Sequence, residues 1–136
     1  MNNKATFQLT NYFFKKIDLD FETEIPKNID VNFDVSGIFK TQEKSFVLNL
    51  TFTAFSPEVD TKFITINCIA TYLFENVENY EDIPTYFYTN SIAILFPYIR
   101  SSVSILTIQA NIPALVLPTY NLLELEKPLR QNTTIE

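Results

Sequence analysis

The stretch NSIAILFPYIRSSVSILTIQANIPALVLPTYNL, from Asn90 to Leu122, is the longest apolar segment of the sequence, and it decides the fold. Its first part predicts a helix, because apolar residues recur at intervals of three and four and therefore share one helix side. These residues are Ile92, Leu95, Phe96, Ile99, Val103 and Leu106. Pro97 lies inside the pattern, so we expect a kink there, or a short helix that restarts with Pro97 in its first turn. The helical pattern stops after Ala110.

The second part of the stretch predicts an extended crossover loop. Pro113 and Pro118 bracket the apolar run Ala114–Leu117. Two prolines this close prevent a continuing helix and favour extended backbone. A loop this apolar must cover another part of the protein or offer itself to a partner.

The sequence before this stretch predicts β-strands. Apolar and polar residues alternate with a period of two, which is the strand period. The predicted strand segments are Thr6–Phe14, Asp18–Ile25, Ile29–Phe39, Ser45–Phe55 and Thr61–Phe74. Alternation in the second segment places its four acids on one face, and these are Asp18, Asp20, Glu22 and Glu24.

Strands joined by short turns and followed by one long helix predict an α+β fold, with an antiparallel sheet covered on one face by the helix. We expect one domain over residues 1–136, with a frayed tail over 124–136. One helix covers only part of such a sheet. The remaining apolar surface is therefore expected to pair with another copy of the chain.

Composition excludes several classes of function. The chain has 16 acidic and 10 basic residues, one Gly, one Cys and no His. Nucleic acid is not an expected partner, because a phosphate backbone is bound by surplus Lys and Arg. Without His, and with Cys68 alone, the chain lacks a Ser-His or Cys-His nucleophile pair and a zinc site of His and Cys. A single Gly gives no dinucleotide fingerprint. We expect no enzyme activity and no cofactor; a carboxylate-based hydrolase stays as the enzymatic alternative.

Three features indicate a cytoplasmic, soluble protein that does not insert into a membrane. The single Cys68 fits a reducing compartment. The first residues, MNNKATFQLT, lack the apolar core of a signal peptide. Uninterrupted apolar runs are short, so we expect no membrane-spanning helix.

Several segments resemble the SecB family, bacterial chaperones that hold unfolded preproteins for export. Ile94–Arg100 (ILFPYIR) resembles the family's helix motif ILFPYAR, and Asn111–Leu117 with Asn121 is similar to its post-helix segment TFPQLNLAPVN. Three weaker matches resemble strand segments of the family. Leu50–Ala54 (LTFTA) resembles the family's VTVTA, Val31–Val35 (VNFDV) resembles VKLDL, and Asp18–Glu22 (DLDFE) resembles DISFE. The order is the family's from Phe7 to Leu122. The sequence therefore resembles a divergent SecB-like member.

The resemblance implies a four-stranded antiparallel sheet, a long helix and a homotetramer built as a dimer of dimers. It also implies a holdase, which binds non-native polypeptides or preproteins in apolar grooves without ATP, for Sec-dependent export. The residues expected to contact the client are Val31, Phe33, Val35, Val103, Leu106, Ile112, Leu115, Leu117, Tyr120 and Leu122. The alternative is that all ten are core. That alternative is favoured for Val103 and Leu106, because apolar residues at helical spacing usually pack inward.

The family's docking site for the export motor SecA matches Asp18, Asp20 and Glu22; the alternative is a solvated strand face. Three departures argue against this docking: a short connection Thr23–Asp30, Asn67 or a neighbour in place of a fourth-strand acid, and a tail without the acidic motor-binding end. Client binding is unaffected by them. A second hypothesis is a dedicated chaperone for one partner, such as the antitoxin of a toxin–antitoxin system. A third is an enzyme or small-ligand protein on the same scaffold.

Overall fold

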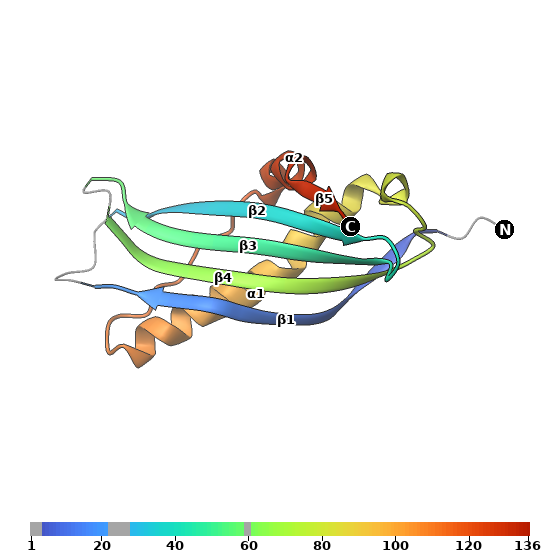
Figure 1. Cartoon of the computed structure of the whole chain (residues 1–136). Helices are drawn as coiled ribbons and strands as arrows, with labels where there is room; N and C mark the ends of the chain where they lie inside the picture. Colours follow the sequence, from blue (N-terminus) through green and yellow to red (C-terminus); the bar gives the residue numbers. More distant parts are fainter. Residues whose placement is uncertain (1–3, 22–27, 59–60) are drawn as a thin grey trace.

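The computed structural model describes residues 4–21, 28–58 and 61–136 (Figure 1). Its strands form one sheet in the order β1-β4-β3-β2-β5, and the long helix α1 crosses one face of it. The elements are β1 Thr6–Leu19, β2 Asp30–Lys40, β3 Ser45–Ser56, β4 Thr61–Glu75, η1 Tyr80–Asp82, α1 Thr85–Gln109, η2 Leu122–Leu125, α2 Glu126–Gln131 and β5 Thr133–Ile135. The predicted α+β fold with one long helix is confirmed, but the predicted strand count of four is wrong, because β5 adds a fifth.

Alternating residues on the central strands form the core face of the sheet. Leu50 of β3 lies opposite Val35 of β2 and Cys68 of β4, and all three are buried beneath α1. On the outer face, the Asn67 amide donates to Asn49 Oδ1 at 2.6 Å and to Thr51 Oγ1 at 2.9 Å. The alternation of the sequence therefore predicted correctly which face of β3 is apolar.

The strand expected over Asp18–Ile25 is not a separate element. β1 is continuous from Thr6 and ends at Leu19. It contains two register irregularities, which keep its apolar side chains facing the core over such a length. Asp20 lies just beyond the strand, where its backbone N–H donates to Phe63 O at 2.9 Å. The remainder of that expected strand, residues 22–25, lies outside the described residues.

The helix α1 begins earlier than the apolar spacing predicted. It starts at Thr85, after Pro84 as N-cap, and runs unbroken through Pro97 to Gln109. A helix that restarts at Pro97 is therefore wrong, while a kink at this residue stays a prediction. The early turn brings Phe87 into an aromatic cluster, where its ring centroid lies 4.8 Å from those of Phe7, Phe46 and Phe74.

Length and composition alone would allow α1 to span a membrane, contrary to the expectation from the sequence. In this fold one side of the helix packs against the sheet, and Ile92, Leu95 and Ile99 on that side have no exposed surface. A helix at the core of an α+β fold meets the same test of length and composition. The criterion is therefore weak evidence for a membrane helix.

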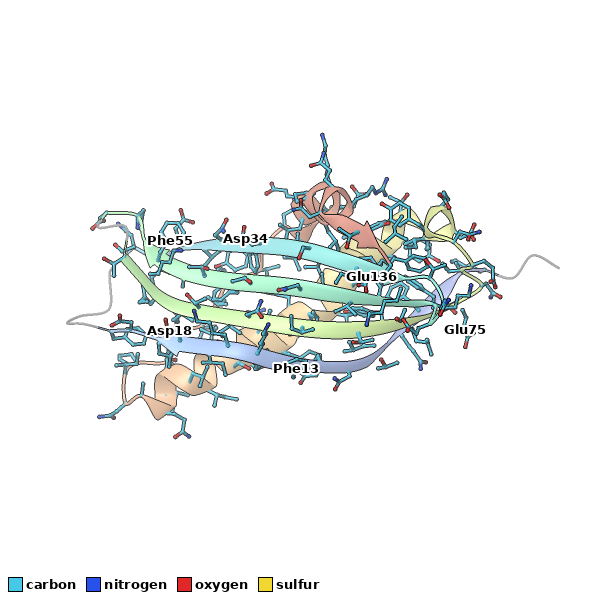
Figure 2. All side chains as sticks on the ribbon, viewed as in Figure 1. Phe13, Asp18, Asp34, Phe55, Glu75 and Glu136 are labelled. Atoms are coloured by element: carbon cyan, nitrogen blue, oxygen red, sulfur yellow. The ribbon has the colours of Figure 1, made fainter. Side chains whose placement is uncertain are left out.

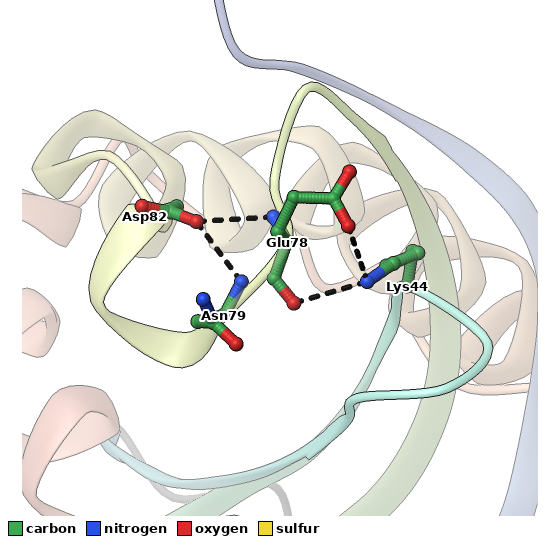
Figure 3. A network of polar contacts seen from close by, with 4 residues as sticks. All are labelled: Lys44, Glu78, Asn79 and Asp82. Atoms are coloured by element: carbon green, nitrogen blue, oxygen red, sulfur yellow. Dashed lines mark hydrogen bonds and ion pairs between the residues drawn. The ribbon is translucent and has the colours of Figure 1, made fainter.

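A polar network joins the β2–β3 turn to the segment that enters α1 (Figure 3). Lys44 Nζ lies 2.7 Å from Glu78 Oε2 and donates to Glu78 O at 3.1 Å. The Asp82 carboxylate accepts bonds from the backbone N–H groups of Glu78 at 3.1 Å and Asn79 at 3.0 Å. Asp82 thus caps η1, and the helix α1 begins only after Pro84.

Residues 124–136 differ from the frayed tail that the sequence predicted. α2 buries Leu129 completely, and β5 pairs in parallel with β2 from Gly37 to Phe39. Figure 1 shows α2 above the β2 side of the sheet, with β5 beside β2. These residues therefore add a short strand to part of the β2 edge.

Candidate functional site

The chain after α1 crosses back from the end of the helix toward the β2 side of the sheet (Figure 1). Asn111, with a φ of 62°, reverses the chain direction. Two hydroxyl groups of α1 then hold Leu115: Ser104 Oγ donates to Leu115 O at 2.9 Å, and Leu115 N–H donates to Thr107 Oγ1 at 3.0 Å. The crossover loop is therefore fixed to the helix by its backbone, and not only by the two prolines.

The substitution Thr107→Val should destabilise the fold by about 1–3 kcal/mol, because it leaves the part-buried N–H of Leu115 without its acceptor. Thr107 is buried, and valine has nearly its shape, so packing changes little. Urea unfolding measures the loss. Ser101→Ala, at an exposed position of α1, is the control and should leave stability almost unchanged. Equal stability of Thr107→Val and the unmodified protein would contradict the anchoring role of the hydroxyl.

An aromatic cluster lies where the loop reaches β2. The Tyr120 ring centroid lies 5.7 Å from those of Phe33 on β2 and Phe96 on α1. Phe33 also lies 5.5 Å from Phe52 on β3. Edge-to-face arrangements at these distances stabilise aromatic pairs beyond the burial of their surface. The cluster therefore fixes the loop, the sheet and the helix relative to one another.

A pocket of about 170 Å³ opens beside this cluster, between β2 and η2. It is lined by Val31, Phe33, Tyr120, Asn121, Leu122, Glu124 and Leu125. The Asn121 side chain accepts a bond from Leu123 N–H at 3.2 Å, and so caps η2, which carries two of the lining leucines. Burial and the negative charge of Asp30 both raise the pKa of Tyr120. A neutral phenol therefore lines the pocket, which can bind an apolar side chain.

The ten residues predicted to contact a client divide into three groups. Four line the pocket, and these are Val31, Phe33, Tyr120 and Leu122. Three are half-buried along α1 and the crossover loop, and these are Leu106, Ile112 and Leu115. Three are core residues with 5% exposure or less, as the alternative stated, and these are Val35, Val103 and Leu117.

Sequence reasoning did not assign Asn121, Glu124 and Leu125 to the site, and these residues complete the pocket wall. Glu124 and Leu125 lie in the segment expected to be frayed. The three-residue spacing of Leu122 and Leu125 is the signal that could have found the wall, because it places both side chains on one side of a helical turn. On the other side of η2, a wider hollow of about 520 Å³ separates Leu123 from Tyr86 of α1.

The acids predicted to dock on SecA do not line this pocket. Asp18 pairs with Thr65 of β4 and lies on the outer face of the sheet (Figure 2). Asp20 is exposed beyond the end of β1, and Glu22 lies outside the described residues. The pocket uses the opposite, helix-covered face. Docking on SecA through these acids stays a prediction.

Comparison with known proteins identifies the fold. No family model matches the chain. The chain is 29% identical over 126 residues to an uncharacterised protein of Methanocaldococcus jannaschii. The aligned region covers 87% of this chain and 81% of that protein. The chain also resembles the solved SecB-like chaperone of Mycobacterium tuberculosis in complex with a ChAD peptide from the antitoxin HigA1. That likeness has a TM-score of 0.67 and 19% identity over 85% of this chain and 91% of the other.

A protein of unknown function from Streptococcus agalactiae is also similar, with a TM-score of 0.53 and 16% identity over 86% of this chain and 100% of the other. At identities this low, the structural likeness shows a shared fold alone. Function must be argued from the pocket.

Proposed function

Because this chain has the SecB-like fold, we propose that it is a divergent SecB-like holdase that binds apolar segments of non-native polypeptides without a nucleotide. The pocket between β2 and η2 carries this proposal, because it is lined by Phe33, Tyr120 and Leu122, which are partly buried apolar residues packed against the core. A structural neighbour with the same fold was solved with a bound peptide, which supports a polypeptide as the ligand. An export client is one case of such a ligand.

The size of the pocket favours a polypeptide side chain over a small-molecule ligand. Small-molecule sites start at roughly 300 Å³, whereas this pocket measures about 170 Å³. Burial of one large apolar side chain contributes about 1.5–3 kcal/mol, so measurable affinity requires several contacts along an extended chain. The half-buried Leu106, Ile112 and Leu115 are the proposed sites of the further contacts.

A homotetramer is part of the proposal. Ile105 and Ile108 of α1 are each 57% exposed, and Ile94 and Tyr98 of the same helix are about 40% exposed. In the part of the chain that the structure describes, β1 pairs with β4 alone, so its other edge is open. Exposed apolar groups of this kind, beside an open edge, favour association between copies.

The test is suppression of the aggregation of a chemically unfolded protein in the absence of nucleotide, with the particle mass measured by light scattering. A holdase of tetramer mass should suppress aggregation at stoichiometric concentration. If aggregation is unchanged even at a molar excess of the protein, the holdase proposal fails. A monomer that suppresses aggregation would reject the tetramer alone.

A dedicated chaperone for one partner is the second candidate. The neighbour from Mycobacterium tuberculosis was solved with an antitoxin peptide, which supports this candidate. The discriminating observation is a single antitoxin that co-purifies with the protein and depends on it for solubility. Equal binding of unrelated unfolded proteins would favour the general holdase.

A further inference from the structure

The segment Glu126–Glu136, which comprises α2 and β5, forms a clip between α1 and the edge of β2. We propose that this clip positions the wall of the pocket, with Leu129 and Asn132 as the positioning residues. The clip itself does not line the pocket. The expected effect of the clip on client binding rests on the proposed function. The position of the pocket wall rests on the structure alone.

The anchor of the clip in the core is Leu129, which has no exposed surface. It is the one buried residue of α2. The next residue, Arg130, places its guanidinium group 4.9 Å from the centre of the Tyr88 ring on α1, and it also pairs with Glu126 at 3.0 Å. A guanidinium group over an aromatic ring at this distance is an attractive contact. α2 is therefore held against the first turns of α1.

Hydrogen bonds attach the other half of the clip to β2. The Asn132 amide donates to Val35 O at 3.2 Å, and Asn132 O accepts from Gly37 N–H at 3.1 Å. Further along, Glu136 N–H donates to Phe39 O at 2.8 Å, and Glu136 O accepts from Thr41 N–H at 3.0 Å. These bonds follow the edge of the same strand that contributes Val31 and Phe33 to the pocket.

The single glycine of the chain lies at this junction. A Cβ atom on Gly37 would come within 2.2 Å of Phe46 Cζ and 3.2 Å of Thr133 Oγ1. The missing side chain therefore gives room to the buried Phe46 ring beneath the sheet and to the close approach of the clip. In turn, the Thr133 hydroxyl donates to Leu129 O at 2.6 Å, which links β5 to α2.

The clip fixes η2 because the two are continuous. Glu126 is both the C-cap of η2 and the first residue of α2, and its N–H donates to Leu123 O. The wall residues Leu122 and Leu125 are only half-buried, so their own packing holds them weakly. An α2 helix held by Leu129 therefore keeps both leucines facing β2.

The clip can loosen without unfolding the rest of the protein. Ile135 of β5 is 56% exposed, and Leu129 supplies most of the apolar burial of the segment. Segments with few buried apolar contacts open at a lower free energy than the core. Leu129→Ala should consequently release the clip while the sheet and α1 stay folded.

The first measurement reads the pocket without any client. The sequence has no tryptophan, so Tyr120→Trp introduces a single indole, which lines the pocket and whose emission is distinct from that of the tyrosines. Leu129→Ala, added to this variant, should shift the indole emission to longer wavelength, because η2 then moves away from the indole and exposes it to water. The matched control is Leu73→Ala, at a leucine of β4 that is 41% exposed, and should leave the emission unchanged. Unchanged emission in the Leu129→Ala variant, with release of the clip shown by hydrogen exchange, would overturn the inference.

The second measurement reads binding, with reduced and carboxymethylated α-lactalbumin as the unfolded probe. Leu129→Ala should weaken its binding about tenfold. Ile38→Cys with Thr134→Cys places two thiols directly opposite one another on β2 and β5, within disulfide reach. Burial raises the pKa of the Cys68 thiol to about 11, so this native thiol should not interfere. The disulfide should restore both the binding and the emission of the Leu129→Ala variant.

The outcomes are distinguishable. Weaker binding by the disulfide-locked protein with Leu129 intact would mean that the clip blocks the site, and would overturn the positioning role. If the unmodified protein binds no probe, the proposed function fails, whereas the indole emission of the Tyr120→Trp variant still decides whether the clip positions the pocket wall.

Discussion

The substitution Phe87→Ala is expected to lower the free energy of unfolding by about 3–5 kcal/mol, the largest stability effect that we predict for one side chain. Phe87 has no exposed surface, and its ring centroid lies 4.8 Å from the ring centroids of Phe7, Phe46 and Phe74. Truncation leaves a cavity between the sheet and the first turn of α1, which surrounding rings cannot fill without leaving their rotamers. Such a loss is a large part of the total stability of a domain.

Urea unfolding followed by far-UV circular dichroism measures the change. The control is Phe13→Ala, since Phe13 is 49% exposed on the outer side of β1 (Figure 2). It should alter the stability of the monomer by no more than about 0.5 kcal/mol. Similar losses from both substitutions would contradict the position of Phe87 at the centre of the core.

The substitution Leu122→Asp is expected to give the largest loss of client binding. Leu122 lines the pocket from η2 opposite Val31, and a carboxylate there would have to be desolvated by an apolar client side chain. Loss of the leucine contact alone removes about 1.5–3 kcal/mol, which corresponds to a loss of affinity between about tenfold and a hundredfold. Suppression of aggregation should therefore disappear at stoichiometric concentration.

Leu123→Asp is the matched control, because it introduces the same charge one residue along the chain. Leu123 is 66% exposed and faces the opposite side of η2. This variant should suppress aggregation like the unmodified protein. Circular dichroism should show that both variants are folded. Equal loss of activity in the two variants would remove the binding role from the pocket between β2 and η2 and assign the effect to charge alone.

The sequence predicted the sheet well because its strands satisfy local and tertiary preferences together. Alternation along β3 matches the burial of Leu48, Leu50 and Phe52. The first turns of α1 were missed, since a run of aromatic residues around Phe87 has no clear period. The clip was missed for another reason. A helix of six residues and a strand of three are too short for a local signal, and the burial of Leu129 stabilises them.

The candidate site was only partly predictable for a related reason. Spacing places Val31 and Phe33 on one strand face, but it cannot say which part of that face lies under α1 and which part lies open beside it. The resemblance to the SecB family indicated β2 and the crossover loop, and residues of both line the pocket. It could not separate the pocket residue Tyr120 from the core residue Leu117, because that depends on how the crossover loop rests on α1.

The two edges of the sheet differ in the length of strand that they leave unpaired, and this affects how copies of the protein can associate. In the described chain, β1 offers an open edge fourteen residues long, while β5 already occupies part of the β2 edge. Two molecules that join through β1 about a twofold axis consume both open edges and leave no equivalent template for a third. Repeated addition, as in a fibril, would need the β2 edge as well. The short strand β5 therefore shortens the β2 edge that such repeated addition would need.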